Sequence, residues 1–301
     1  MTYTIGIDAG GTKTTGLIID SEKNILFQTK TGFGNPNVNF NEALHNVWEA
    51  VSACLNSPFG KGCKTIVAGV AGIEAEGNRE RFEQFFSTRT NIPTIFVNDA
   101  VLAYHALFDD QNGILTIAGT GSISYGRNGE KDGYSGGWGH ILGDFGSAYD
   151  IAIKVFRQIT KEADQGLPHS PLSQALLNDL EISSADGLKG FIYNALKGEI
   201  ASVSSFVFAE AQKGDEEAKR FFLDAGVELA NQTFSLFKKL DIKLPLKVGC
   251  KGSLLEKNPY AKKEFESTLQ KLVGDVEFIR NEITPAIGSL SVAVLYEKKG
   301  S

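Results

Sequence analysis

The sequence predicts an α/β protein of two domains, the second of which partly repeats the first. Short apolar runs typical of strands alternate with longer runs typical of helices, which is the pattern of α/β folds. A strand, a turn of glycine and hydroxyl residues and a second strand occur at the N-terminus and again about a hundred residues later. With 301 residues the chain is long enough for two domains, each with its own core.

The first part of the chain opens with three strands that can pair antiparallel and continues with alternating helices and strands. Its strand-like runs are Tyr3–Ile7, Thr14–Ile19, Ile25–Thr29, Thr65–Val70 and Thr94–Val97. Its helix-like runs are Asn39–Leu55, Asn78–Thr90 and Ala100–Phe108. A polar turn cluster at 109–113 follows, and we expect the main domain boundary there.

The second part repeats the strand, turn and strand and then carries a long helical insertion. Its strand-like runs are Gly113–Ala118, Ile123–Gly126, Leu246–Gly249 and Val276–Ile279. Its helix-like runs are Ser147–Lys161, Pro171–Leu177, Gly187–Leu196, Ser202–Lys213 and Asp215–Leu240. A final helix is predicted from about Pro285 to Lys298, and its small residues fit either core packing or close approach to a neighbouring helix or hinge.

Composition narrows the classes of protein to which this chain can belong. A net charge of −6 and an isoelectric point near 5.4 argue against nucleic-acid and membrane-surface partners. We expect a cytoplasmic protein, because no apolar run approaches the ~18 residues of a membrane span and the N-terminus lacks a signal-peptide pattern. The three cysteines, Cys54, Cys63 and Cys250, fit neither a disulfide framework nor a metal cluster.

The first glycine and hydroxyl turn follows Asp8 and has the composition of a phosphate-binding turn. Its glycines can adopt positive φ and allow a phosphate close to the backbone N–H groups, while its hydroxyls and lysine add hydrogen bonds and charge. These residues are Gly10, Gly11, Thr12, Lys13 and Thr14. Asp8, at the strand end, suits Mg²⁺ held through water. By itself, the segment also fits an ordinary hairpin with a polar turn.

The second turn makes the phosphate interpretation stronger. It has the same order of strand, turn and strand, and two such turns that face each other could hold a polyphosphate from both sides. Its residues are Gly119, Thr120, Gly121 and Ser122. Neither turn is a P-loop, and the chain contains no G-x-G-x-x-G, so a dinucleotide site has no support.

Asp99 is the candidate general base. It follows a strand and starts the helix-like run Ala100–Phe108, so it fits an N-cap that accepts the free N–H groups of the first turn. A carboxylate at a strand end can also take the proton of a phosphoryl acceptor hydroxyl. The two roles are compatible, since a cap fixes the side chain that then does the chemistry.

Two polar loops are candidates for binding the acceptor. The segment 136–147 contains five glycines, and within it Trp138 offers an apolar face while Asp144 can accept hydrogen bonds from sugar hydroxyls. Ser147 is expected to cap the following helix. Asn35 precedes a proline in another loop, where it fits either a turn residue or a ligand of a polyol.

These motifs, in this order, resemble the N-acetylglucosamine kinase branch of the actin/hexokinase/Hsp70 superfamily, which is grouped with the BadF/BadG/BcrA/BcrD ATPases. The resemblance covers nearly the whole chain. It rests on the segments Asp8–Thr14, Asn98–Ala100, Gly119–Ser122, Gly136–His140 and Gly143–Tyr149. It implies two actin-like (ribonuclease H-like) domains with a nucleotide and sugar cleft between them. The implied domains are 1–112, completed by the C-terminal helix 285–301, and 113–284 with its helical insertion.

The resemblance also implies roles for individual residues. Asp8 would lie near Mg²⁺, the two turns would hold the ATP phosphates, and Asp99 would take the proton of the C6 hydroxyl. The sugar site would be lined by Asn35, Asp99, Gly137, Trp138 and Asp144. The adenosine would lie against the strand Leu246–Gly249 and the turn that follows it, with Gly249, Gly252 and Ser253 as contacts.

Two positions depart from the family pattern. Phe145 stands where a glutamate is usual, which removes a carboxylate beside the sugar site and bears on the choice of acceptor. The adenosine turn is often a Gly-Gly pair, but here it reads Gly249-Cys250-Lys251-Gly252, which bears on nucleotide preference.

The expected function is therefore an ATP-dependent kinase that makes the 6-phosphate of an N-acetylated amino sugar. N-acetylglucosamine is the first choice, N-acetylmuramic acid the second and free glucosamine the alternative. Two other classes use this fold: an ATPase that activates a radical enzyme, and a sugar-binding sensor. The first needs cysteines spaced for an iron–sulfur cluster, and the spacing here does not match. The partner is a small-molecule amino sugar, with no nucleic acid and no membrane, and a homodimer is left open.

Overall fold

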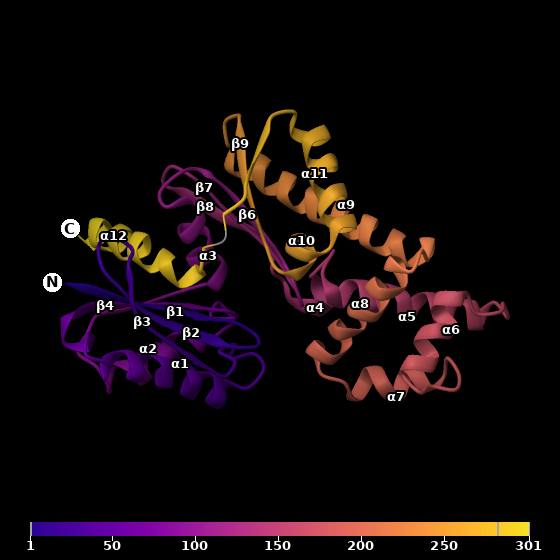
Figure 1. Cartoon of the computed structure of the whole chain (residues 1–301), viewed down its shortest axis with the longest axis horizontal. Helices are drawn as coiled ribbons and strands as arrows, with labels where there is room; N and C mark the ends of the chain where they lie inside the picture. The colour runs from indigo at the N-terminus through magenta and orange to yellow at the C-terminus, as the bar shows by residue number, and fades with distance from the viewer. Residues whose placement is uncertain (1, 282, 301) are drawn as a thin grey trace. The chain divides into compact units, whose positions relative to one another are not determined.

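The computed structural model describes residues 2–281 and 283–300 (Figure 1). The chain forms two compact units, one from the residues up to Asn112 together with those from Arg280 onward, and the other from Gly113–Ile279. Each unit contains one five-stranded mixed sheet with helices. The prediction of an α/β fold is therefore confirmed.

The sheet of the first unit has the order β3-β2-β1-β4-β5. The first three strands are antiparallel neighbours, and β4 and β5 then add in parallel to β1. The strands are β1 Tyr3–Ala9, β2 Thr14–Ile19, β3 Ile25–Thr31, β4 Cys63–Val70 and β5 Thr94–Val97. All five were predicted, with differences of up to two residues at their ends.

Helices cover both faces of this sheet. They are α1 Phe40–Leu55, α2 Asn78–Ser87, α3 Asp99–Phe108 and α12 Ser289–Gly300, with 3-10 turns η1 Gly60–Gly62 and η2 Pro285–Gly288. Side chains alternate between the two faces along β4, so Ile66 packs with side chains of α1 and α2 and Val67 with those of α3 and α12. In Figure 1, α1 and α2 lie below this sheet and α12 lies above it. The unit is thus a three-layer α/β/α sandwich.

The predicted final helix, 285–301, is two elements. Pro285 starts the 3-10 turn η2 and α12 follows from Ser289, while residue 301 lies outside the described residues. Gly288 is needed here, because a methyl group on it would collide with Leu102 and Ala106 of α3. The small residues therefore serve close approach to a neighbouring helix, one of the two functions that the sequence allowed.

The sheet of the second unit has the order β10-β9-β6-β7-β8, which repeats the topology of the first. Again three antiparallel strands are followed by two that add in parallel. The strands are β6 Gly113–Ala118, β7 Ser122–Asn128, β8 Lys131–Gly136, β9 Leu246–Lys251 and β10 Val276–Ile279. The repeat inferred from the sequence is confirmed, although β8 was not predicted.

One large apolar core joins the helices of the second unit to its sheet. The helices are α4 Gly139–Leu142, α5 Ala148–Asp164, α6 Pro171–Asp179, α7 Gly187–Asn194, α8 Lys197–Gln212, α9 Glu216–Leu240, α10 Ser253–Lys257 and α11 Pro259–Val273. Neither α10 nor α11 was predicted. Ser147 caps α5 as expected, since its hydroxyl accepts from the N–H of Asp150 at 3.2 Å.

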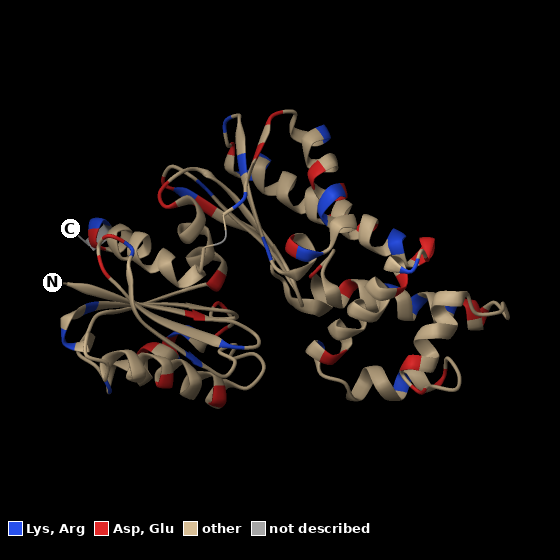
Figure 2. Cartoon of the chain, viewed as in Figure 1, with Lys and Arg blue, Asp and Glu red and all other residues tan. Residues whose placement is uncertain are grey.

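The surface carries charges of both signs. In the view of Figure 2, Lys and Arg are mixed with Asp and Glu along the helices of the second unit, with no large block of one sign. Among the described residues, no helix is both long and apolar enough to span a membrane.

Candidate active site

The β1–β2 turn presents an open surface at the carboxyl end of β1. The N–H of Gly10 donates to the carbonyl of Lys13 at 3.0 Å, and the N–H of Gly34 donates to the carbonyl of Gly10 at 2.8 Å. Thr12 and Lys13 are exposed, and a methyl group at Gly11 would meet nothing within 4 Å. Gly10 and Gly11 do not adopt positive φ, so glycine here provides open space above the backbone rather than a left-handed bend.

Thr14 differs from its neighbours in this turn. It is the first residue of β2, and its side chain is fully buried. Its Oγ1 makes no hydrogen bond within the described part of the chain, and Gly34 packs directly against it. Its hydroxyl is therefore not on the surface that Thr12 and Lys13 share.

The β6–β7 turn has the same character in the second unit. The N–H of Gly119 donates to the carbonyl of Gly121 at 2.9 Å, and the N–H of Ala148, in the first turn of α5, donates to the carbonyl of Gly119 at 2.9 Å. Thr120 is exposed and a methyl group at Gly119 would meet nothing within 4 Å. Ser122 is buried, with its hydroxyl donating to the carbonyl of Phe145 at 2.7 Å, so it shapes the turn from within.

The turn after β9 lies beside the end of β6. Gly252 has a φ of 90°, and a methyl group on it would collide with the carbonyl of Ala118. Ser253 starts α10. Gly252 therefore lies beside the start of the β6–β7 turn, whereas Gly249 is buried inside β9, where it pairs with Leu115.

The register of the first sheet brings Asp8 and Asp99 to one edge. Asp8 on β1 pairs with Gly69 of β4, and Gly69 pairs with Val97 of β5, two residues before Asp99. A methyl group at Gly69 would lie 2.6 Å from Cβ of Leu102, so glycine allows α3 to pack closely over β4. That packing positions the first turn of α3, which carries Asp99.

Both carboxylates have raised pKa values. Burial, with a further contribution from the charge of Asp99, raises the pKa of Asp8 to about 7 against the opposing charge of Lys13. Burial raises the pKa of Asp99 to about 6, although backbone N–H groups, among them that of Ala100, lower it. Asp99 is therefore mostly ionised at neutral pH but basic enough to accept a proton, as a general base requires.

The expected N-cap role of Asp99 is wrong by one residue. Asn98 is the N-cap of α3, with φ −65° and ψ 146°, and its Oδ1 accepts from the N–H of Ala100 at 3.0 Å. Asp99 is the first helical residue, and its Oδ1 accepts from the same N–H at 3.0 Å. Because Asn98 provides the cap, Asp99 is not needed for that purpose.

Side-chain hydrogen bonds that were not predicted from the sequence hold the loop of Asn35. The Oδ1 of Asn35 accepts from the N–H of Asn37 at 2.9 Å, which is the turn role that the sequence allowed. The Nδ2 of Asn78 donates to Oδ1 of Asn37 at 3.1 Å and to the carbonyl of Gly72 at 2.9 Å. Arg79, next along α2, donates to the carbonyl of Phe96 at the end of β5. The sequence offered one indication of these hydrogen bonds, which is the position of Asn78 just after Gly77 at the start of a helix-like run.

The segment 137–145 of the second unit exposes large apolar side chains. Trp138 is 74% exposed, and Ile141, Leu142 and Phe145 are also exposed. Gly137 has a φ of 74°, and its N–H donates to the carbonyl of Ser122 at 3.0 Å, which connects the segment to the β6–β7 turn. The Trp138 side chain is therefore open to solvent, and its role in binding a sugar stays a prediction.

Asp144 is buried and has partners within the second unit. Its Oδ1 accepts from the N–H of Ser122 at 3.1 Å, and its Oδ2 lies 2.7 Å from Nζ of Lys197 at the start of α8. A sugar hydroxyl that donates to Asp144 would therefore bind a carboxylate that already accepts from the N–H of Ser122 and from Lys197. Lys197 is a further residue that the sequence reasoning did not single out.

The residues present fit ATP and Mg²⁺. Within residues 2–281 and 283–300, no three His, Cys, Asp or Glu side chains gather as a metal cage. Mg²⁺ is usually held by one or two carboxylates together with substrate phosphates, and a cation beside Asp8 would stabilise its ionised form. In both turns, exposed threonines lie beside open backbone, as a phosphate requires.

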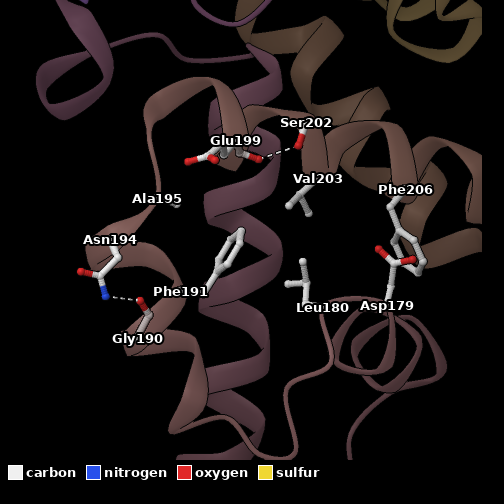
Figure 3. A pocket seen from close by; sticks show the side chains of 10 residues that line it. All are labelled: Asp179, Leu180, Gly190, Phe191, Asn194, Ala195, Glu199, Ser202, Val203 and Phe206. Carbon is white, nitrogen blue, oxygen red and sulfur yellow. Dashed lines mark hydrogen bonds between the residues drawn. The ribbon is translucent and has the colours of Figure 1, made fainter.

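A separate pocket of about 490 Å³ lies between α6, α7 and α8 in the helical insertion. Figure 3 shows the ring of Phe191 and the side chains of Leu180 and Val203 directed toward its centre. None of the residues predicted for the active site lines it.

The chain belongs to the BadF/BadG/BcrA/BcrD ATPase family, whose model matches residues 5–293. It is 31% identical over 301 residues to the N-acetylmuramic acid/N-acetylglucosamine kinase of Clostridium acetobutylicum, covering 97% of this chain and 98% of that one. It is 28% identical over 319 residues to the N-acetyl-D-glucosamine kinase of Dictyostelium discoideum, with 98% of each chain covered.

A solved structure shares the fold. It comes from Chromobacterium violaceum and is provisionally described as an N-acetylglucosamine kinase. Its TM-score is 0.76 at 22% identity, with 96% of this chain and 98% of that chain covered. The family assigned from sequence motifs alone is confirmed by these comparisons.

Proposed function

We propose that this protein is an ATP-dependent kinase that phosphorylates the C6 hydroxyl of an N-acetylated amino sugar. The observation that carries the proposal is the pair Asp8 and Asp99 at one sheet edge, with the pKa of Asp99 raised to about 6. Membership of an ATPase family and likeness over nearly the full length to named amino-sugar kinases support it.

Asp99 acts as the general base. Phosphoryl transfer needs the acceptor hydroxyl held in line with the γ-phosphate, and its proton must pass to a nearby carboxylate as the new O–P bond forms. The bond between the γ-phosphorus and the bridging oxygen breaks and ADP leaves. The enzyme contributes mainly positioning and neutralisation of charge.

The nucleotide is bound by the two turns. Gly10, Gly11, Thr12 and Lys13 of one turn and Gly119, Thr120 and Gly121 of the other hold phosphates, while Thr14 and Ser122 support the turns. Gly252 and Ser253 contact the adenosine, with Gly249 behind them in β9. Asp8 would hold Mg²⁺, which would supply positive charge to the phosphates.

The sugar is bound by Asn35, Gly137, Trp138 and Asp144 together with Asp99. Trp138 supplies an apolar face for the ring or the acetyl methyl, since its side chain is 74% exposed. Phe145, where the family has a glutamate, favours an acylated sugar over one with a free amine. N-acetylglucosamine is the preferred acceptor, N-acetylmuramic acid the second, and glucosamine the alternative.

The two units act as the two domains of this kinase. The predicted domains, 1–112 completed by 285–301 and 113–284, differ from the units only in residues 280–284, which belong to the first unit. An ATPase activator of a radical enzyme is disfavoured because the spacing of Cys54, Cys63 and Cys250 does not match that of iron–sulfur ligands. A colourless purified protein would agree with this, and iron–sulfur absorbance would contradict it.

Product analysis tests the proposal. Mg-ATP and N-acetylglucosamine should give ADP and a sugar monophosphate, and phosphorus–proton correlation spectra should place the phosphate on C6. A phosphate on C1, or ATP hydrolysis with no sugar phosphate, would contradict the proposed reaction. N-acetylmuramic acid and glucosamine in parallel assays distinguish the three acceptors.

A further inference from the structure

A negative charge lies directly against the second phosphate turn, Gly119–Ser122. Asp144 is 4% exposed, and its Oδ1 accepts from the N–H of Ser122 at 3.1 Å. A methyl group at Gly121 would lie 2.8 Å from the same oxygen, so the backbone of the turn packs closely against this carboxylate. The carboxylate holds the turn in shape, but it also repels any polyanion that the turn is to bind.

Lys197 supplies the opposite charge. Its Nζ lies 2.7 Å from Oδ2 of Asp144, at the first residue of α8 in the helical insertion. In the described part of the chain, no other Lys or Arg forms an ion pair with Asp144. The lysine side chain is 36% exposed whereas that of Asp144 is 5% exposed, so the buried charge depends on this one partner.

The α5 helix adds a second constraint on the same turn. The N–H groups of Ala148 and Tyr149, in its first turn, donate to the carbonyls of Gly119 and Thr120 at 2.9 and 3.4 Å. The positive end of this helix dipole favours an anion at the turn, and an unpaired Asp144 would offset that effect. Lys197 therefore offsets the negative charge that Asp144 places beside the turn.

We propose that Lys197 is a positioning residue for nucleotide binding, which acts by neutralising the Asp144 carboxylate beneath the phosphate turn. The inference rests on the proposed function, because it takes Gly119–Ser122 to bind phosphates. Lys197 acts through Asp144 and needs no contact with the nucleotide. The role goes beyond that of a surface ion pair, since its loss changes affinity for a polyanion and not stability alone.

Mg-ADP binding measured by calorimetry without sugar tests the role of Lys197. Lys197→Met should weaken Mg-ADP binding about tenfold, because it leaves the buried carboxylate unpaired. The double variant Lys197→Met/Asp144→Asn should return to within about threefold of the wild-type affinity, since both charges are gone. Lys197→Arg should also stay within about threefold, because it retains the positive charge.

The control is Lys189→Met in the same insertion. Lys189 forms an ion pair with Asp186 in which both side chains are largely exposed, so the change removes the same charge with no buried partner. Mg-ADP affinity should be unchanged. Melting temperatures of all variants, measured in parallel, show whether Lys197→Met is folded at the assay temperature.

The outcomes separate the inference from the proposed function. Wild-type protein that does not bind Mg-ADP would contradict both. Wild-type binding together with undiminished affinity in Lys197→Met would overturn the inference alone. A double variant as weak as Lys197→Met would also overturn it, because the lysine would then act through the shape of the site and not through the charge of Asp144.

Discussion

Asp8 and Asp99 lie at the ends of two strands on either side of β4, and the negative charge of Asp99 helps to raise the pKa of Asp8 to about 7. Two partly buried carboxylates at one edge are unfavourable for the fold alone, because each loses solvation and they repel each other. Such an arrangement is typical of a site that receives a cation and a proton from its ligands.

The first prediction is that Asp8→Asn stabilises the fold while it abolishes activity. The folded-state pKa of Asp8 lies above its usual 3.8, so the folded protein holds a proton more tightly than the unfolded chain does. The ionised group therefore reduces the free energy of unfolding at pH 7, and the effect disappears as the pH falls below about 4. Because the side chain is partly open to solvent, we expect a gain of roughly 1–3 kcal/mol at pH 7.

Thermal unfolding at pH 7 and pH 4 measures this effect, with Asp20→Asn as the control. The side chain and N–H of Asn24 hold the pKa of Asp20 below its usual value, so the same substitution there should not stabilise the protein. A melting temperature of Asp8→Asn at or below that of the wild type at pH 7 would contradict the electrostatic account of the pair.

The second prediction concerns the pH profile. With the pKa of Asp99 near 6, kcat/KM should be level above about pH 7 and fall about tenfold per pH unit below pH 6, because protonated Asp99 cannot accept the acceptor proton. Rates at saturating Mg²⁺ between pH 5 and 8 measure this. The residual rate of Asp99→Asn should not show this fall in kcat/KM below pH 6. If the variant shows the same fall, the titrating group is a residue other than Asp99.

The third prediction is that Gly119→Ala weakens nucleotide binding without loss of stability. A methyl group there meets nothing within 4 Å and the φ of Gly119 is not positive, so the fold accepts it. It occupies the space in which a phosphate would approach the backbone, and we expect KM for Mg-ATP to rise tenfold or more. Gly190→Ala on α7, also in open space, is the control and should leave KM unchanged. An unaltered KM for Mg-ATP in Gly119→Ala would exclude this turn from phosphate binding.

The fourth prediction is that Trp138→Ala raises KM for the sugar about tenfold and leaves the melting temperature within about 1 °C. The indole is 74% exposed, so its loss removes little packing within the protein. Tyr193→Ala, at an aromatic residue that is 86% exposed on α7, controls for loss of an exposed ring. If both variants keep the wild-type KM for the sugar, Trp138 does not form part of the acceptor site.

The sequence predicts the strands and both turns because their signals are local. Apolar runs ending in glycine and hydroxyl residues define β1, β2, β6 and β7, and the structure has them. By contrast, β8 is polar and contains two glycines, so it lacks an apolar run. The start of α11 at Asn258 and Pro259 was a capping signal, but its buried face consists of three residues, Ala261, Phe265 and Leu269, which is a weak pattern.

The partners of the candidate site residues could not be predicted in the same way. Lys197 lies 53 positions after Asp144, and Asn78 lies 41 positions after Asn37. No spacing rule connects such pairs, since tertiary packing brings them together. The cap of α3 was missed by one residue because Asn98 and Asp99 are both good capping residues, and backbone geometry selects between them.

The most direct measurement of the central claim is sugar-dependent ADP release from Mg-ATP by the wild type and by Asp99→Asn. A coupled assay should compare N-acetylglucosamine, N-acetylmuramic acid, glucosamine, N-acetylmannosamine and glucose. We predict turnover on an N-acetylated sugar and a loss of at least about a hundredfold in kcat for Asp99→Asn, whose melting temperature should not fall. No sugar-dependent turnover in the wild type, or undiminished kcat in Asp99→Asn, would contradict the account.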